Sequence, residues 1–324
     1  MVKIAIAGAS SGLGREVLDT LVGTGKHEIL VLGRGDSSNS GVLPGVIRIQ
    51  TAFDNHTELV TLLDDVHTLL CFWSPAKDPG AEAQKRLVNA AIDAGVRRFA
   101  PSSWSTGSKL EECLDVYPFY ASKLAMLDYL QEINKDKKVI EYTSFEVGMF
   151  MEFLAYPQQT TKHISPIPGI VLLNDKRIIA LEGHLDDALT FTSVEDIAGV
   201  VAVAVEYQGE WPAVGGINGD RLSLRSIQRI AEKLYGTPFR VDILQQSDVE
   251  AGVVKLDDLP AIEHAAIPKE KRAQFAKLAT RGLLLSAARG AWTVTDDWNK
   301  LLSNYKFTSV EDFVARLIKP ADAN

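Results

Sequence analysis

Short apolar runs alternate with amphipathic segments along the first half of the chain. Runs bounded by glycine or polar residues are typical of buried strands, and they occur at 2–7, 28–32, 46–50, 67–72, 98–100 and 141–145. Between several of them, apolar residues recur at helical spacing, at 13–22, 57–63, 81–94 and 120–134. This alternation predicts an α/β fold with a doubly wound (Rossmann) parallel sheet, whose ligand lies at the carboxyl ends of the strands.

The pattern becomes less regular after Gly148. Helices are expected at 191–206 and 224–235, the second with Ser223 as N-cap and Gly236 as its end, and a strand at 214–218. We expect a dinucleotide-binding domain at 1–150 and a smaller C-terminal substrate-binding region at 151–324. Segments near 187–220 are expected to rejoin the first domain.

Composition and charge exclude several classes of function. The 324 residues carry a net charge of −8, and no run of Lys or Arg exceeds three residues, which argues against a nucleic-acid partner. No apolar stretch reaches the roughly 18 residues that span a bilayer, and no signal peptide is evident at the start. Two cysteines give no disulfide framework. We therefore expect a cytoplasmic protein without a membrane partner.

A glycine-rich turn follows the first strand directly and begins the first helix. In this position Gly8 allows the tight turn, Gly12 allows close approach of a pyrophosphate, and Gly14 allows helix–sheet packing. Backbone N–H groups and the helix dipole then favour phosphate. The predicted contacts of this turn are Gly8, Ser10, Ser11, Gly12, Leu13 and Gly14.

The end of the second strand favours NADP(H) over NAD(H). An acid there usually binds the ribose 2′-hydroxyl of NAD, but Glu28 begins its strand and lies at the wrong end. Arg34 stands at the correct end, where a guanidinium can pair with a 2′-phosphate. Phe53 and Asp54, after the third strand, are candidate adenine contacts.

The Tyr-x-x-x-Lys pair of short-chain dehydrogenases is absent. Lys123 lies in the expected helix, but Phe119 stands four residues before it. Tyr120 is three residues before Lys123, so an α-helix would rotate it about 100° from the required position. We therefore expect its hydroxyl to miss the site.

The remaining motifs resemble the atypical branch of that superfamily, which contains isoflavone reductase-like and NmrA-like proteins. The resemblance runs the length of the chain and rests on the segments 96–104, 192–198 and 305–313, and on Lys123. It implies that Lys123 is catalytic, contacting the nicotinamide ribose and assisting proton transfer. Ser103-Trp104 replaces the Glu-Phe of the plant reductases, so their substrates are not implied here.

Further candidates leave the strands at the same sheet edge. Those expected to contact the cofactor are Phe72, Trp73, Ser74, Ser102, Glu146 and Gly148. Those expected to contact a substrate are Ser103, Trp104, Met149, Phe150 and Phe153. The six histidines show no metal-ligand spacing, and no Gly-x-Ser-x-Gly elbow is present.

These features favour an NADPH-dependent reductase of a small, mainly apolar or aromatic molecule. One alternative is an NmrA-like regulatory protein that senses the dinucleotide without turnover. Another is a non-redox isomerase or cyclase in the same pocket, because a fold does not fix a function.

Overall fold

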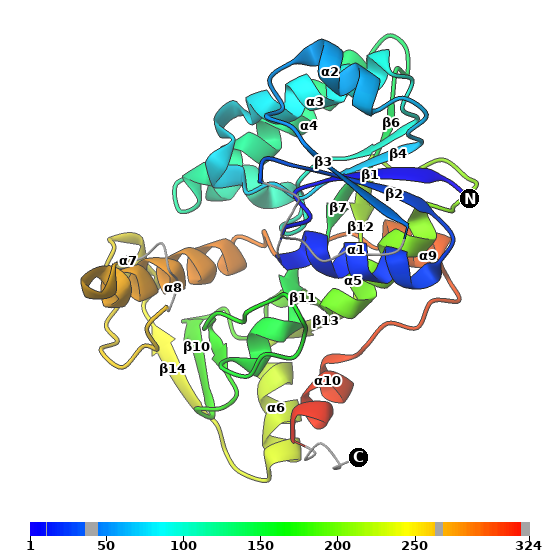
Figure 1. The fold of residues 1–324 in the computed structure, drawn as a ribbon. Coiled ribbons are helices and arrows are strands. Elements are labelled where there is room, and N and C mark those ends of the chain that lie inside the picture. Colours follow the sequence, from blue (N-terminus) through cyan, green and yellow to red (C-terminus); the bar gives the residue numbers. More distant parts are fainter. Residues whose placement is uncertain (11, 36–44, 263–267, 319–324) are drawn as a thin grey trace.

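A six-stranded parallel sheet forms the first half of the molecule (Figure 1). The computed structural model describes residues 1–10, 12–35, 45–262 and 268–318. The strand order is β3-β2-β1-β4-β5-β6, and every pairing is parallel. The strands are β1 (Lys3–Ala7), β2 (Glu28–Gly33), β3 (Val46–Gln50), β4 (Thr68–Cys71), β5 (Arg98–Ala100) and β6 (Glu141–Tyr142).

The alternation of side chains along β1 divides the core into two layers. Ile4 and Ile6 pack on one face, while Ala5 and Ala7 pack on the other. The first face is covered by α1 (Gly12–Thr24) and α5 (Val194–Ala204). The second is covered by α2 (His56–Leu62), α3 (Glu82–Asp93) and α4 (Ala121–Ile133), as Figure 1 shows. The predicted doubly wound fold is confirmed.

The strand order reverses between β1 and β4, which are neighbours in the sheet. Chains leave these two strands toward opposite sides, so a crevice opens at their carboxyl ends. The glycine-rich turn after β1 and the segment after β4 both lie at this crevice. The sheet therefore places the predicted ligand contacts where a doubly wound fold binds its ligand.

Two predictions for later elements need correction. The expected strand at 141–145 is divided into β6 and β7 (Ser144–Glu146), and β7 pairs instead with β12 (Val214–Gly216). The expected helix at 191–206 begins too early, because β11 (Ala188–Thr192) occupies its first residues. Ser193 then caps α5 by accepting a hydrogen bond from the Asp196 amide.

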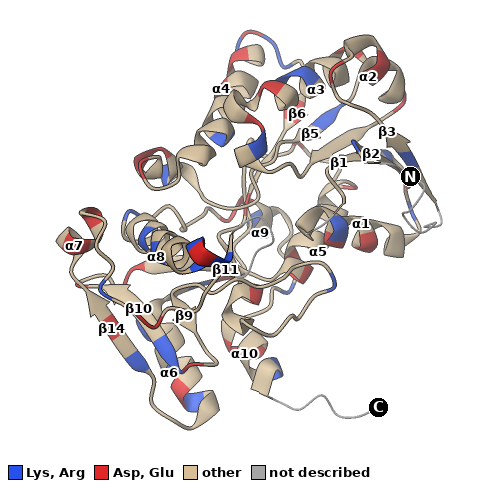
Figure 2. Cartoon of the chain, turned by 60° about the vertical axis from the view of Figure 1, so that its left-hand side comes forward, with Lys and Arg blue, Asp and Glu red and all other residues tan. Residues whose placement is uncertain are grey.

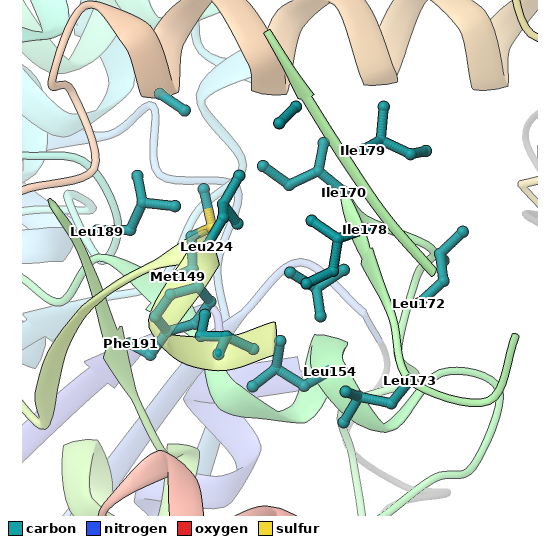
Figure 3. Packing of buried hydrophobic residues seen from close by; sticks show 14 of the residues in the cluster. Met149, Leu154, Ile170, Leu172, Leu173, Ile178, Ile179, Leu189, Phe191 and Leu224 are labelled. Atoms are coloured by element: carbon teal, nitrogen blue, oxygen red, sulfur yellow. The ribbon is translucent and has the colours of Figure 1, made fainter. Parts of the chain in front are cut away.

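The second half of the chain builds two three-stranded sheets around a separate apolar core (Figure 3). One sheet has the order β14-β10-β9 and the other β13-β11-β8. The remaining strands are β8 (Met149–Phe150), β9 (Val171–Leu172), β10 (Arg177–Leu181), β13 (Asp220–Ser223) and β14 (Arg240–Leu244). The remaining α-helices are α6 (Leu224–Tyr235), α7 (Gln246–Glu250), α8 (Arg272–Ala288), α9 (Asp297–Leu301) and α10 (Val310–Ile318).

Helix α6 matches its predicted bounds, with Ser223 as N-cap and Gly236 in the left-handed conformation at its end. Lys and Arg are interspersed with Asp and Glu over both halves of the ribbon (Figure 2). Within the described residues, no helix combines the length and apolar character needed to cross a membrane.

Candidate active site

A cavity of about 530 Å³ opens at the carboxyl ends of the first three strands. The glycine-rich turn, the end of β2 and the segment after β4 form its walls. The lining residues include Gly8, Ser10, Arg15, Arg34, Arg48, Phe53, Phe72, Trp73, Ser74 and Lys77. Four of the described lining residues are cationic and none is acidic, so the cavity suits a phosphorylated ligand.

Glycines are needed in the turn for steric reasons. Gly8 has a φ of +93°, and a Cβ there would lie 2.9 Å from the backbone oxygen of Phe72. A Cβ on Gly14 would lie 2.8 Å from the Gly8 oxygen, which accounts for the close packing of α1 on the strand. Gly12 has a φ of +60° and begins α1, but it does not line this cavity. Ser11 lies outside the described residues.

Three arginines converge on the cavity, and the sequence argument found one of them. Arg34 is exposed at the end of β2, as expected. Arg15 follows the glycine turn in α1, and Arg48 lies on β3 opposite Val31 of β2. The Nη2 of Arg48 is buried and has no hydrogen-bond partner in the part of the chain that the structure describes.

The surroundings of Arg48 suit an anion. Burial lowers the pKa of Arg48, and the positive charge of Arg15 lowers it further, while Asp19 acts in the opposite direction. A phosphate could pair with this guanidinium through two parallel hydrogen bonds. The signal in the sequence was a single Arg between two isoleucines in the strand Val46–Gln50.

The two residues predicted to contact adenine behave differently. Phe53 is 3% exposed, lines the cavity and makes an edge contact with Trp73, at 4.8 Å between ring centroids. Asp54 is exposed and is absent from the lining. The α2 N-cap is Asn55, whose side chain accepts from the Glu58 amide. The structure therefore brings Phe53, but not Asp54, to the cavity.

A second cavity, of about 230 Å³, adjoins the first. Both are lined by Phe72 and Trp73, so one extended ligand can reach from the cationic cavity into the second. The second cavity is lined by Leu13, Gly14, Phe72, Trp73, Pro75, Ser102, Ser103, Trp104, Ser105, Tyr120, Lys123 and Phe150. Aromatic rings and one buried cation dominate this set.

Lys123 lies in the first turn of α4 and is 7% exposed. Its ammonium donates hydrogen bonds to the Ser103 carbonyl oxygen, at 2.5 Å, and to the Ser105 hydroxyl. The same nitrogen lies over the Tyr120 ring, 4.1 Å from its centroid. The lysine is therefore held by fixed protein groups at the wall of the second cavity.

Burial shifts the pKa values of Lys123 and of the neighbouring Glu146 toward 7. Desolvation lowers the pKa of Lys123 to about 7, although the negative charge of Glu146 opposes that shift. Desolvation and the charge of Asp297 raise the pKa of Glu146 to about 7, opposed by Lys123. An amine with a pKa near 7 is suited to give and take protons at neutral pH.

The sequence predicts that the Tyr120 hydroxyl misses the site, and the structure adds that its ring lies under the Lys123 ammonium and lines the same cavity. Tyr120 ends a 3₁₀ turn, Pro118–Tyr120, and α4 begins at Ala121. Residues three apart are neighbours on a helix surface, so the two side chains meet although Tyr120 is rotated from the position four residues before Lys123. Burial raises the pKa of Tyr120, and a hydrogen bond with Ser105 opposes that rise.

The residues after β5 carry both structural and site roles. The Ser102 hydroxyl donates to the Trp73 carbonyl oxygen at 2.5 Å, tying together two walls of the site. The Trp104 ring stacks between Phe72 and Phe145, at centroid distances of 4.4 and 4.8 Å. Its φ of +25° is an unusual backbone conformation for a bulky residue, of the kind that clusters at functional sites.

Several candidates at the ends of later strands lie away from both cavities. Glu146 is buried behind Lys123, and its Oε2 has no hydrogen-bond partner among the described residues. Gly148 packs so closely against Thr190 that a Cβ on it would lie 2.3 Å from the Thr190 backbone oxygen. Met149 lies among Leu189, Leu224 and other core residues (Figure 3).

The aromatic residues at the end of β8 divide between the cavity and the core. Phe150 lines the second cavity, and Phe153 packs against it with ring centroids 5.5 Å apart. Phe153 itself is absent from the lining. Across the described ranges, no group of three His, Cys, Asp or Glu side chains is placed to hold a metal.

Comparison with known proteins places this arrangement among related chains. A model of the NmrA-like family matches residues 2–314. Oxidoreductase BOA1 of Botryotinia fuckeliana is 24% identical over 239 residues, covering 73% of this chain and 77% of the relative. Oxidoreductase swnN of Metarhizium robertsii is 21% identical over 332 residues, covering 97% and 96%.

Solved structures share the fold at lower identity. AtPrR2 with NADP⁺ and (+)pinoresinol superposes with a TM-score of 0.69, at 17% identity, covering 98% of this chain and 99% of that one. The NADPH-dependent quinone oxidoreductase QOR2 of Escherichia coli, complexed with NADPH, has a TM-score of 0.69 at 19% identity, covering 98% and 100%. The triphenylmethane reductase of Citrobacter sp. with NADP(H) has a TM-score of 0.68 at 17% identity, covering 98% and 100%.

Proposed function

The chain belongs to the NmrA-like family, and on that premise we propose that it is an NADPH-dependent reductase of a small, mainly apolar or aromatic molecule. The observation that carries the proposal is the continuity of a cationic cavity over the glycine turn with an aromatic cavity walled by a buried lysine. The related chains named as oxidoreductases, and the similar folds solved with NADP(H), support the same reading.

The residues of the first cavity fit a dinucleotide with a third phosphate. The turn at Gly8 and Ser10 would hold the pyrophosphate on backbone N–H groups and the dipole of α1. Arg15, Arg34 and Arg48 would bind the 2′-phosphate, which gives the buried Nη2 of Arg48 its acceptor. This fit favours NADPH over NADH as the cofactor.

The second cavity selects the substrate by its lining. Phe72, Trp73, Trp104, Tyr120 and Phe150 present aromatic surface, so burying an apolar or aromatic molecule there is favourable. The polar lining residues come from the segment after β5 and the start of α4, and two of them hold Lys123. A substrate would thus place its apolar body on the rings and its reacting polar group beside these polar residues.

NADPH, when bound, supplies a hydride to a carbon of the substrate. Lys123 would stabilise the negative charge that develops on the substrate and would be the source of the proton that neutralises it. Its lowered pKa suits this role because the charged and neutral forms are then both populated near pH 7.

The test is oxidation of NADPH by the purified protein with a panel of probes: acetophenone, cinnamaldehyde, menadione, a benzylic aryl ether and malachite green. We expect turnover of at least one probe, and Lys123→Met should lower kcat for a carbonyl probe about 10²-fold or more. Lys135→Met, which removes an exposed lysine just past α4, is the matched control and should keep wild-type activity.

Two results would overturn the proposal in favour of its alternatives. Equal affinity for NADPH and NADP⁺ with no turnover of any probe would favour a regulatory sensor. A product of unchanged mass, formed without oxidation of NADPH, would favour an isomerase or cyclase.

A further inference from the structure

Two of the three N–H groups of Lys123 are donated to protein oxygens. One N–H is donated to the Ser103 carbonyl oxygen and one to the Ser105 hydroxyl, and the ammonium also lies over the Tyr120 ring. An ammonium has three donors and no acceptor, so these two bonds fix its orientation. Lys123 lines the cavity, but only 7% of the residue is exposed.

Ser105 is in direct contact with Lys123. It is half-buried, it lines the cavity, and its Oγ accepts from Lys123. A second hydrogen bond joins it to Tyr120. A serine hydroxyl has two acceptor lone pairs and one donor. With Lys123 donating to Oγ, the Ser105 hydroxyl keeps its own O–H donor, which can turn toward a substrate in the cavity.

The other hydroxyls of the segment after β5 are less suited to this role. The Ser102 hydroxyl is already donated to the Trp73 carbonyl oxygen. Thr106 is 4% exposed, and its Oγ1 lies 3.5 Å from the Ser105 Oγ, at the limit of a hydrogen bond. Ser103 contributes its backbone carbonyl to Lys123. Ser105 is thus the hydroxyl that both touches the lysine and faces the cavity.

We propose that Ser105 is a further catalytic residue, which relays the proton from Lys123 to the substrate. This inference rests on the proposed reductase function and specifies the route of its proton. Lys123 supplies that proton through the Ser105 hydroxyl, which accepts its hydrogen bond.

The relay balances for a ketone substrate. The carbonyl carbon gains the hydride of NADPH, which becomes NADP⁺, and the carbonyl π bond breaks as its electron pair moves to oxygen. That oxygen takes the proton of the Ser105 hydroxyl, and the serine oxygen takes one from the Lys123 ammonium. The neutral lysine regains its proton from solvent, so one ketone, one NADPH and one proton give one alcohol and NADP⁺.

The experiment compares Ser105→Ala, Ser105→Thr and the control Ser108→Ala, an exposed serine three residues along the chain. NADPH oxidation is followed with the carbonyl probe that the wild type reduces fastest, and NADPH affinity is measured by quenching of tryptophan fluorescence. We expect Ser105→Ala to lower kcat about 10²-fold or more, with KM and NADPH affinity within about threefold of wild type. Ser105→Thr keeps a hydroxyl and should restore most of kcat, while Ser108→Ala should match the wild type.

The outcomes separate the relay from the proposed function. Wild-type turnover with an undiminished kcat in Ser105→Ala would overturn the relay and leave the reductase function standing. Equal losses in Ser105→Ala and Ser105→Thr would also overturn it, because packing rather than the hydroxyl would then matter. Failure of the wild type to reduce any carbonyl probe would overturn the proposed function and the relay together.

Discussion

Replacing Lys123 by methionine should stabilise the protein near neutral pH while removing its activity. The side chain is 7% exposed, and burial lowers its pKa from 10.5 to about 7. The folded state therefore holds this charge at a cost of about 4 kcal/mol at pH 7 relative to an uncharged side chain. Methionine has a similar length and no charge, so the variant escapes that cost.

The pH dependence isolates this electrostatic cost from other effects of the substitution. Between pH 7 and 10.5 the unfolded chain binds more protons at Lys123 than the folded chain does, so the destabilisation fades as pH rises. At pH 9.5 about 1 kcal/mol remains. The hydrogen bonds lost to Ser103 and Ser105 lower the stability of the variant by a similar amount at both pH values.

Glu146 changes the size of this difference but not its sign. Its pKa is raised to about 7 in the wild type, and the charge of Lys123 opposes that rise. At pH 9.5 the folded wild type has lost the ammonium too, so the carboxylate no longer distinguishes it from the variant. The advantage of Lys123→Met over the wild type should therefore be about 3 kcal/mol smaller at pH 9.5 than at pH 7.

Urea titrations at the two pH values measure this difference as free energies of unfolding. Lys135→Met provides the control, because its lysine is exposed and should show no such dependence. An advantage of Lys123→Met that stays constant or grows with pH would refute the argument that the site holds a desolvated ammonium.

Three further predictions follow from single contacts. Arg48→Leu should weaken NADPH binding about tenfold or more and leave NADH binding unchanged, measured by calorimetry; equal weakening of both would exclude the 2′-phosphate contact. The kcat of the wild type should fall as pH rises through about 7, where Lys123 loses its proton. Glu146→Gln should move that fall to lower pH, because the glutamate charge raises the lysine pKa. A pH profile of kcat that is unchanged in Glu146→Gln would contradict this coupling. Gly148→Ala should lower the free energy of unfolding in urea by at least about 3 kcal/mol, since the added Cβ meets a backbone oxygen. Gly95→Ala, with open space around it, should lower it by about 1 kcal/mol. Similar losses in both variants would show that the positive φ, and not the contact at Gly148, causes the destabilisation.

Much of the fold was predictable because many strands and helices are recognisable from the local pattern of apolar residues. The strand at 46–50 and the helix at 224–235 match β3 and α6, since each is a periodic run with clear boundaries. The predicted helix at 191–206 was wrong at its start. Phe191 and Thr192 belong to β11, where pairing with β8 and β13 decides their conformation, and no local pattern records such pairing.

Parts of the candidate site were predictable where a residue type and its place in the chain indicate one role. The glycine turn and Lys123 follow from position in the chain, and the structure places them around the two cavities. The contact of the Tyr120 ring with Lys123 was not predicted, because spacing alone does not say that side chains three apart on a helix touch. Arg48 and Ser105 were not predicted as site residues, because their surroundings in the site are built by neighbours that are distant in sequence.

Calorimetric titration of the purified wild-type protein with NADPH, and separately with NADH, shows whether the cationic cavity binds the 2′-phosphate of the dinucleotide. The cationic cavity should bind NADPH at least about tenfold more tightly than NADH, because one additional phosphate meets the arginine cluster. Absence of heat with NADPH, or equal affinity for the two dinucleotides, would contradict the account of this site.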